Sequence, residues 1–144
     1  MTIYVDAAVH AWRGQTWCHL FSPDIEGLHD FARRLGLRRS WFQDPSTSRK
    51  VSWPHYDIVD ARRTRAIAMG AVALDRHRTS VMSRVVLDRW CGTAGTDRAR
   101  DPLAMHRRLG SARLSELEEW LVSIHPEYRA RHDDATHRMD EEPT

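Results

Sequence analysis

The sequence lacks the features that mark several large classes of protein. It has two cysteines, Cys18 and Cys91, too few and too far apart for a disulfide-rich fold or a Cys-x-x-Cys motif. No run approaches the ~18 apolar residues of a membrane span. The first residues, MTIYVDAAVHAWRG, also lack the basic-then-apolar order of a secretory signal. We therefore expect reduced thiols in a cytoplasmic protein that has no membrane partner.

The common signatures of enzymes are also absent. The sequence contains no GxSxG, no GxxxxGK[ST], no HExxH and no GxGxxG after a strand. A serine hydrolase, a P-loop NTPase or a dinucleotide enzyme therefore has no basis in the sequence. Cys18 and His19 are neighbours, but adjacent side chains of a strand point to opposite faces, so they do not form a nucleophile and base pair.

Lysine is nearly absent, since Lys50 is the only one and 21 of the 22 basic residues are arginine. Arginine binds phosphate or carboxylate through a planar fork of donors. A genome rich in G and C is the alternative explanation for its abundance. Between residues 76 and 113 nine arginines accompany three aspartates. This excess of positive charge makes the stretch a candidate contact for nucleic acid.

The first half of the chain alternates between strand and helix patterns. Alternating side chains predict strands over residues 2–6 and 16–21, with a turn at Arg13 and Gly14 before the second. Apolar residues at helical spacing predict a first helix that Ser22 caps and Gly36 ends.

A long polar segment with two prolines separates this helix from the next. It predicts a loop over residues 44–54. A second helix, capped by Asp57 or Asp60, is expected to run to Met69, followed by a strand over residues 71–74. The block at residues 37–43 fits a short strand or an extended segment equally well.

The second half is predicted to be helical. One apolar face predicts a helix around residues 81–90, and a short helix is expected over residues 102–109. A capping box of Ser115 and Glu118 predicts a last helix that ends before Pro126. The expected class is α/β, a small sheet with flanking helices and a helical C-terminal extension. The expected parts are an α/β domain over residues 1–75, an arginine-rich extension packed on it over residues 76–128, and a disordered tail over residues 129–144.

Four polar side chains form the clearest candidate site, as catalytic groups and as metal ligands. Asp6 ends a predicted strand, His19 projects from another, and His55 and Asp57 lie where the long loop meets the second helix. Strand ends and helix starts are where α/β proteins bind ligands, so we expect the four to meet. Two imidazoles and two carboxylates suit zinc, manganese or iron, which polarises a phosphoester or generates a hydroxide. In the structural alternative, His19 makes a core hydrogen bond, Asp57 caps a helix and His55 is a plain loop residue.

Further side chains are candidates for contacts with a ligand. Arg62 and Arg63 of the second helix are candidates for holding an anion, with a solvated helix face as the alternative. Trp41 and Trp53 flank the loop and are candidates for stacking on a base. The complete expected ligand-binding set is Tyr4, Trp41, Gln43, Tyr56, Arg62 and Arg63.

Several of these residues lie in short motifs that follow one another in a fixed order. The order is IYVD, CHL, LHDFARRLGLRR, SWFQ, PHYD and RR-x-x-A-x-A-x-GAV. It resembles the bacterial and phage family catalogued as domain of unknown function 4031, roughly over residues 1–74. The resemblance implies a compact α/β domain and points to the same polar residues, but it implies no activity.

Two hypotheses of different classes follow. In the first, a small α/β protein binds a phosphate-bearing or nucleotide-like ligand and hydrolyses a phosphoester with the help of a divalent metal at the four polar residues. In the second, a non-enzymatic nucleic-acid-associated module uses the arginines of residues 76–113. An interaction adaptor is a third alternative.

Overall fold

The computed structural model of the protein describes residues 2–93 and 101–128. Contacts divide the chain into two compact units, residues 1–102 and 103–144, and each is described by itself. The tail over residues 129–144, predicted to be disordered, lies outside the described residues. Among the described residues, no helix combines the length and the apolar character needed to cross a membrane.

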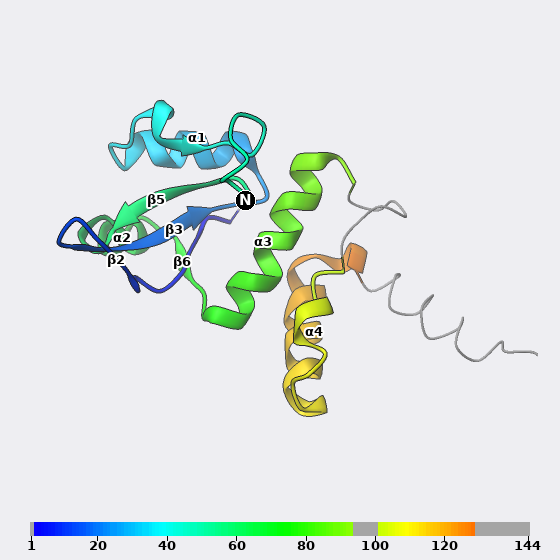
Figure 1. The fold of residues 1–144 in the computed structure, drawn as a ribbon. Helices are drawn as coiled ribbons and strands as arrows, with labels where there is room; N and C mark the ends of the chain where they lie inside the picture. The colour runs from blue at the N-terminus through cyan, green and yellow to red at the C-terminus, as the bar shows by residue number, and fades with distance from the viewer. Residues whose placement is uncertain (1, 94–100, 129–144) are drawn as a thin grey trace, which may run out of the picture. The chain divides into compact units, whose positions relative to one another are not determined.

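The first unit is built on a mixed sheet of six strands (Figure 1). The strand order is β4-β5-β3-β1-β6, with β2 paired to β3. Strands β1 and β6 run parallel, and the other pairs are antiparallel. The strands are β1 (Tyr4–Val5), β2 (His10–Trp12), β3 (Gln15–Phe21), β4 (Phe42–Gln43), β5 (His55–Val59) and β6 (Val72–Ala73).

Three helices complete this unit and confirm the predicted α/β class. They are α1 (Ile25–Arg34), α2 (Asp60–Ala68) and α3 (Arg76–Cys91). The block at residues 37–43 contains a 3-10 turn, η1 (Arg39–Trp41), followed directly by β4. The long loop over residues 44–54 is free of helix and strand, as predicted.

A tight hairpin joins β2 to β3. Arg13 and Gly14 fill its two loop positions with φ of 49° and 73°, between the paired residues Trp12 and Gln15. Positive φ at both loop positions is what a type I′ turn requires, and its twist matches that of the flanking strands. The turn was predicted, whereas β2 was not, because its three exposed residues show no alternation.

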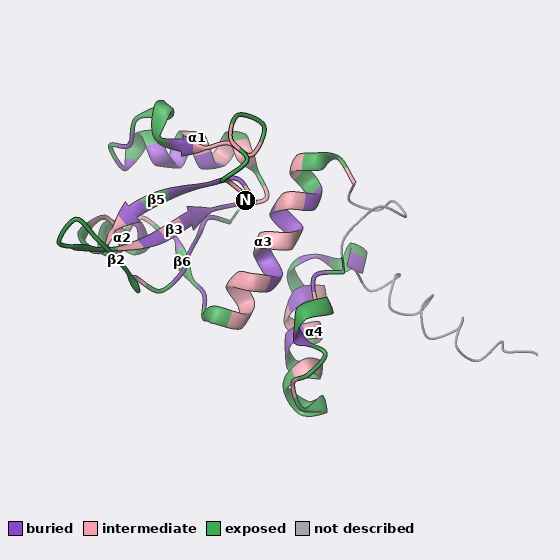
Figure 2. Cartoon of the chain, in the orientation of Figure 1, coloured by how far each residue is buried: buried purple, intermediate pink, exposed green. Residues whose placement is uncertain are grey.

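Helices α1 and α2 contribute to a hydrophobic core on one face of the sheet. The core joins Leu28 and Phe31 of α1 and Ala66 of α2 to Leu20 and Ile58 of the sheet. Figure 2 shows these buried segments along α1, β3 and β5. Each fully buried leucine or isoleucine contributes about 1.5–3 kcal/mol. Because side chains alternate along a strand, the neighbours of Leu20 and Ile58 point to the opposite face.

The first helix begins later than predicted. Asp24, and not Ser22, caps α1, and its carboxylate accepts a hydrogen bond from the Gly27 backbone N–H at 3.0 Å. Ser22 is buried and donates instead to the carbonyl of Thr2 at 2.7 Å. The predicted end is confirmed, since Gly36 follows the helix with a φ of 87°, which glycine adopts without strain.

The second helix and the residues before it also differ from the prediction. His55–Val59 form the strand β5 rather than a junction between loop and helix. Val59 occupies the N-cap position of α2, so neither Asp57 nor Asp60 caps it. Pairing with both β3 and β4 holds this segment extended, and the β-branched Ile58 suits a strand. Gly70 ends α2 as predicted, and β6 follows.

The later helices are partly as predicted. Helix α3 is confirmed, with Asp75 as its N-cap and Gly92 at its end. In the second unit, α4 (Ser111–Ile124) begins before the predicted capping box of Ser115 and Glu118, which was therefore wrong, and ends before Pro126 as predicted. The short helix expected over residues 102–109 is only a 3-10 turn, η2 (Ala104–His106). A further 3-10 turn, η3 (Pro126–Tyr128), follows α4.

Candidate metal centre and adjoining cleft

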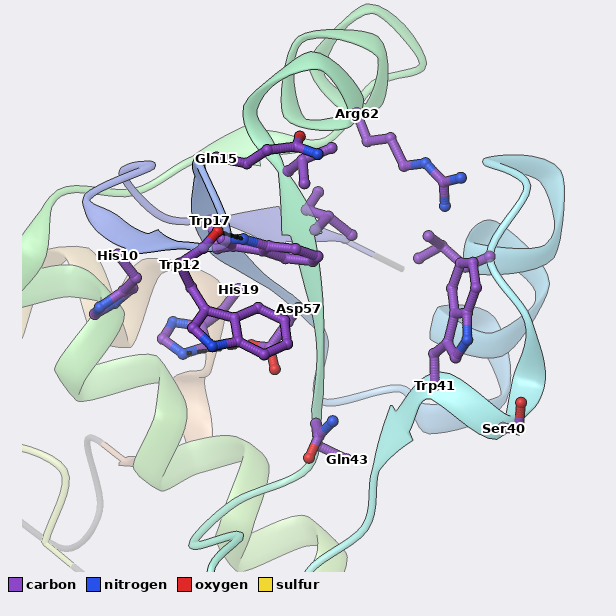
Figure 3. Close-up of a pocket in the computed structure, with 13 residues that line it drawn as sticks. His10, Trp12, Gln15, Trp17, His19, Ser40, Trp41, Gln43, Asp57 and Arg62 are labelled. Atoms are coloured by element: carbon purple, nitrogen blue, oxygen red, sulfur yellow. Dashed lines mark hydrogen bonds and ion pairs between the residues drawn. The ribbon is translucent and has the colours of Figure 1, made fainter.

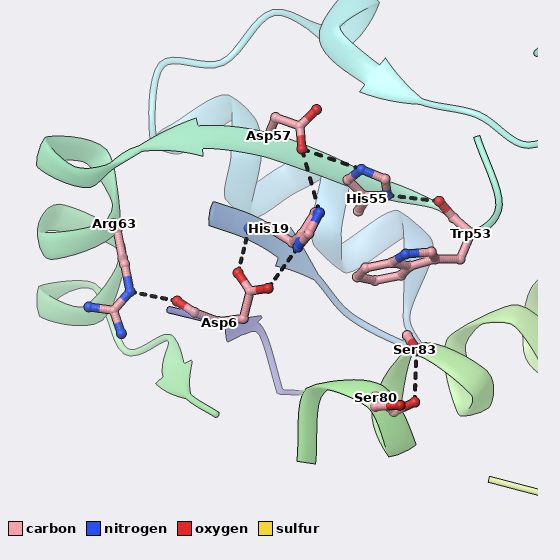
Figure 4. A network of polar contacts seen from close by, with 8 residues as sticks. All are labelled: Asp6, His19, Trp53, His55, Asp57, Arg63, Ser80 and Ser83. Carbon is pink, nitrogen blue, oxygen red and sulfur yellow. Dashed lines mark hydrogen bonds and ion pairs between the residues drawn. The ribbon is translucent and has the colours of Figure 1, made fainter. Parts of the chain in front are cut away.

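The strands β3 and β5 and the residue that follows β1 bring polar side chains into one row across the sheet. His19 on β3 pairs with Asp57 on β5. On the other side of β3, the Asp6 backbone N–H donates to the His19 carbonyl at 3.3 Å. Side chains of directly paired residues lie on the same face of a sheet. Asp6, His19 and Asp57 therefore lie side by side, on the face opposite the hydrophobic core (Figure 4).

His55 joins this row because side chains repeat on the same face at every second residue of a strand, and β5 carries both His55 and Asp57. The ring centroids of His19 and His55 are 4.8 Å apart. The Trp53 ring packs against both, at 5.3 Å from His19 and 4.7 Å from His55. We call Asp6, His19, His55 and Asp57 the His/Asp cluster. All four are residues that the sequence nominated.

Asp6 fixes the orientation of the His19 ring. One carboxylate oxygen of Asp6 accepts from the backbone N–H of His19 at 2.6 Å, and the other lies 2.7 Å from His19 Nδ1. An ionised carboxylate only accepts, so Nδ1 carries a proton and, in the neutral ring, Nε2 carries the lone pair. Burial favours the neutral ring, but the hydrogen bond to Asp6 and the charges of Asp6 and Asp57 outweigh it and raise the pKa of His19.

His55 is oriented in the same way by a different acceptor. Its Nδ1 lies 2.8 Å from the carbonyl oxygen of Trp53, which can only accept. The proton of the neutral ring therefore resides on Nδ1, and the lone pair is again on Nε2. His55 is buried, so this hydrogen bond is shielded from water. Both imidazoles thus present an unprotonated Nε2 when they are neutral.

The two Nε2 atoms converge on the exposed carboxylate of Asp57. Asp57 Oδ1 lies 3.4 Å from His55 Nε2 and 3.9 Å from His19 Nε2. Burial opposes ionisation of Asp57, yet the hydrogen bond and charge of His55 and the charges of His19 and His10, when these rings are protonated, lower its pKa. Three electron-rich atoms this close repel one another unless a proton or a cation lies among them. Ligand atoms about 2.1 Å from a tetrahedral ion lie about 3.4 Å apart, so the geometry suits a small divalent cation.

Two of the predicted ligand residues do not reach the His/Asp cluster. Tyr56 lies between His55 and Asp57 on β5 and points to the other face, where its hydroxyl bonds to His29 Nδ1 at 2.8 Å. Tyr4 is buried, and its ring stacks on Phe21 with centroids 5.8 Å apart. Burial raises the pKa of both tyrosines. Neither side chain lines the cleft described below.

Arg63 supports the site from outside it. Its Nε donates to the backbone carbonyl of Asp6 at 2.7 Å, which ties α2 to the end of β1 (Figure 4). Arg63, which was predicted to hold an anion, therefore holds the backbone of a cluster residue through its Nε. Its neighbour Arg62 points elsewhere, into the cleft.

A cleft of about 750 Å³ adjoins the cluster (Figure 3). His19 and Asp57 line it, together with three of the predicted ligand residues, Trp41, Gln43 and Arg62. The hairpin of β2 and β3 also contributes to its lining, through side chains that the sequence did not nominate. These are His10, Trp12, Gln15 and Trp17.

His10 is the side chain of most chemical interest among those that were missed. Its ring centroid lies 5.2 Å from that of His19, and it forms a second potential metal-binding group with Asp6 and His19. A signal for it was present in the sequence. A two-residue turn at Arg13 and Gly14 imposes the register that pairs His10 with Trp17 on β3, on the face that also bears His19.

One protein family matches this chain. The family, described as protein of unknown function (DUF4031), matches residues 3–86 and therefore more than half of the 144 residues. The match extends beyond residue 74, where the motifs end, into α3. The whole His/Asp cluster and every residue that lines the cleft lie within it. Neither the curated proteins nor the solved structures give a match.

Proposed function

The chain belongs to the DUF4031 family of proteins of unknown function, and we propose that it is a metal-dependent hydrolase of a phosphoester. Its metal is a divalent zinc, manganese or iron ion held by His19 Nε2, His55 Nε2 and the carboxylate of Asp57. Two nitrogen ligands and one oxygen ligand suit these ions. The substrate binds in the adjoining cleft, with its phosphate toward the ion.

The observation that carries the proposal is the way in which both imidazoles are held. Asp6 accepts from Nδ1 of His19, and the Trp53 carbonyl accepts from Nδ1 of His55. Histidines that bind metals almost always donate from their other ring nitrogen to such an acceptor. Both oxygens of Asp6 are engaged by His19, so Asp6 is a positioning residue in this proposal rather than a ligand.

The same arrangement supplies what hydrolysis needs. A divalent ion held by His19, His55 and Asp57 would lower the pKa of a bound water to about 7 and so supply a hydroxide near neutral pH. The hydroxide oxygen would form a bond to phosphorus while the ester bond to the leaving oxygen breaks. His10 is exposed in the cleft beside His19 and gives a proton to that leaving oxygen, and the proton released by the water restores it. Arg62, which lines the cleft, neutralises charge on the phosphate.

The proposal is tested by hydrolysis of p-nitrophenyl phosphate and bis(p-nitrophenyl) phosphate. Protein purified without a metal-binding tag is stripped with a chelator and assayed with zinc, manganese or iron(II) added singly. We expect one of these ions to restore hydrolysis. Asp57→Asn removes the carboxylate ligand and should lower the rate by more than about tenfold.

Asp60→Asn is the matched control, because Asp60 is an exposed aspartate of α2 that lies outside the cluster. It should hydrolyse both esters like the unmodified protein. If no added metal stimulated the hydrolysis of either of the two esters, that result would contradict the proposal. Equal loss in Asp57→Asn and Asp60→Asn would contradict the assignment of the ligand.

A further inference from the structure

Two exposed tryptophan rings lie in the cleft. Trp12 on β2 is 56% exposed and Trp41 in η1 is 43% exposed. Burial of a large apolar side chain contributes about 1.5–3 kcal/mol, so two rings left open to solvent give up that stabilisation. Both line the same cleft, and in Figure 3 they lie on its opposite sides. Partly exposed aromatic rings on two sides of one cleft are suited to a flat aromatic ligand.

Trp17 holds the Trp12 side of the cleft in place. The two rings pack edge to face with centroids 5.7 Å apart, and Trp17 Nε1 donates to the carbonyl of Trp12 at 3.0 Å. The Arg13 guanidinium lies 4.3 Å from the Trp12 ring. Trp12 is therefore ordered before any ligand binds, which lowers the entropic cost of binding.

The rest of the lining adds polar groups suited to a base and its phosphate. The side-chain amides of Gln15 and Gln43 both donate and accept hydrogen bonds, as the edges of nucleobases do. The Arg62 guanidinium lies over the Trp41 ring, 5.4 Å from its centroid, and places a positive charge at the cleft. The volume of about 750 Å³ falls in the range of about 300–1,000 Å³ that small-molecule sites occupy.

We propose that the cleft binds the nucleobase of a nucleotide, which stacks on Trp41 while its phosphate is directed to the ion held by His19, His55 and Asp57. This inference rests on the proposed function for the position of the phosphate, and on Trp12, Trp41 and the two glutamines for the base. His19 and Asp57 line the same cleft as both tryptophans, so a base and its phosphate share one continuous site. The substrate class is a nucleoside phosphate or the end of a single strand of nucleic acid.

Calorimetry with two matched probes tests the base site. Adenosine monophosphate carries a base and a phosphate, and ribose 5-phosphate carries the same phosphate without the base; each is used as its phosphonate analogue, which has no ester bond to hydrolyse. Stacking of one base on an aromatic side chain strengthens binding about 5- to 150-fold. We expect the metal-loaded protein to bind the probe with the base more tightly than the probe without it, by this factor.

Three variants assign the effect to the tryptophan. Trp41→Ala should bring the affinities for the two probes together, whereas Trp41→Phe keeps an aromatic face and should retain part of the ratio. Ile67→Ala is the control, because Ile67 is an exposed apolar residue of α2 outside the cleft and should leave the ratio unchanged. Metal content should be the same in all three variants.

The outcomes separate this inference from the proposed function. Equal affinity for the two probes in the unmodified protein would overturn the base site, while metal-dependent binding of ribose 5-phosphate would leave the metal centre standing. A preference for the nucleotide over ribose 5-phosphate that survives removal of the metal would support the base site by itself. It would do so even where the hydrolysis assay had contradicted the proposed function. Comparison with a short single-stranded oligonucleotide identifies the source, because tighter binding of the strand assigns a strand end and equal binding assigns a free nucleotide.

Discussion

Replacement of Asp6 by asparagine tests how the His/Asp cluster is organised. The Asp6 carboxylate accepts twice from His19, from the backbone N–H at 2.6 Å and from Nδ1 at 2.7 Å. Asparagine keeps one acceptor oxygen and presents an NH₂ group in place of the other. When the backbone N–H keeps the oxygen, the NH₂ group faces Nδ1 and the ring proton moves to Nε2. His19 then loses the lone pair that faces Asp57.

Two effects of different size are expected. Loss of the acceptor behind a metal-binding histidine lowers metal affinity about 10- to 100-fold. Loss of one hydrogen bond to a charged group costs the metal-free protein about 1.5–3 kcal/mol of its free energy of unfolding. The variant is therefore expected to fold, since Asp6 adds no apolar contact to the core, and to bind metal weakly.

The assay is a calorimetric titration of chelator-treated protein with zinc, followed by denaturant unfolding in the presence of chelator. Asp30→Asn is the matched control, because Asp30 is an exposed carboxylate of α1 that pairs with Arg33 at 2.6 Å. It should bind zinc like the unmodified protein. Unchanged zinc affinity in folded Asp6→Asn would refute the role of Asp6 in holding the His19 ring.

The effect of Asp6→Asn on the free energy of unfolding should also depend on pH. The pKa of His19 is raised above its ordinary value, because its bond to Asp6 and the charges of Asp6 and Asp57 outweigh its burial. The resulting stabilisation of the metal-free protein is fully present below the ordinary histidine pKa of about 6.5 and is lost as pH rises through the raised pKa. With chelator present, the difference in unfolding free energy between the unmodified protein and Asp6→Asn should thus be larger at about pH 6 than at about pH 9. An equal difference at both would contradict this.

Three further predictions concern other parts of the protein. Burial raises the pKa of the Cys18 thiol to about 12, whereas Cys91 is exposed. A thiol reagent should therefore label only one cysteine of the folded protein and both cysteines after denaturation. Labelling of both cysteines without denaturant would refute the protection of Cys18. Tyr56→Phe removes the bond to His29 at 2.8 Å and should lower the free energy of unfolding by about 0.5–1.5 kcal/mol without changing metal content; loss of metal would show that Tyr56 belongs to the cluster after all. Removal of the metal should weaken the binding of nucleotide. Binding of single-stranded DNA that persists after chelation and falls steeply with salt would instead favour the hypothesis that residues 76–113 contact nucleic acid.

The spacing of apolar and polar residues within single segments was sufficient to predict the α/β fold class and the strand that bears His19. Alternation over residues 16–21 assigns Cys18 and Leu20 to one face and His19 to the other, and the structure has both Cys18 and Leu20 in the core. The meeting of Asp6 with His19 depends on antiparallel pairing of β1 with β3, which joins residues distant in sequence. No periodicity within a single segment specifies that pairing.

One difference between the predicted and the observed site comes from a segment that was assigned to the wrong element. When residues 55–57 are interpreted as a junction before a helix, His55, Tyr56 and Asp57 form one polar set. In the strand β5 the middle residue faces away, which separates Tyr56 from its neighbours and directs it to His29. What makes the segment a strand is its pairing on both sides, with β3 and with β4. That information lies outside the segment.

The metal content of the protein tests the central claim most directly. Tag-free protein is incubated with zinc, manganese or iron(II), freed of unbound ions and measured by mass spectrometry of the elements, beside His55→Ala and His29→Ala. His29 is the matched control, because it too is a histidine with a bonded Nδ1, but it is only half-buried and lies on the other face of the sheet. We expect about one ion for each chain in the unmodified protein and in His29→Ala, and none in folded His55→Ala. An unmodified protein that retains no ion, or a His55→Ala variant that retains a full one, would contradict the metal centre.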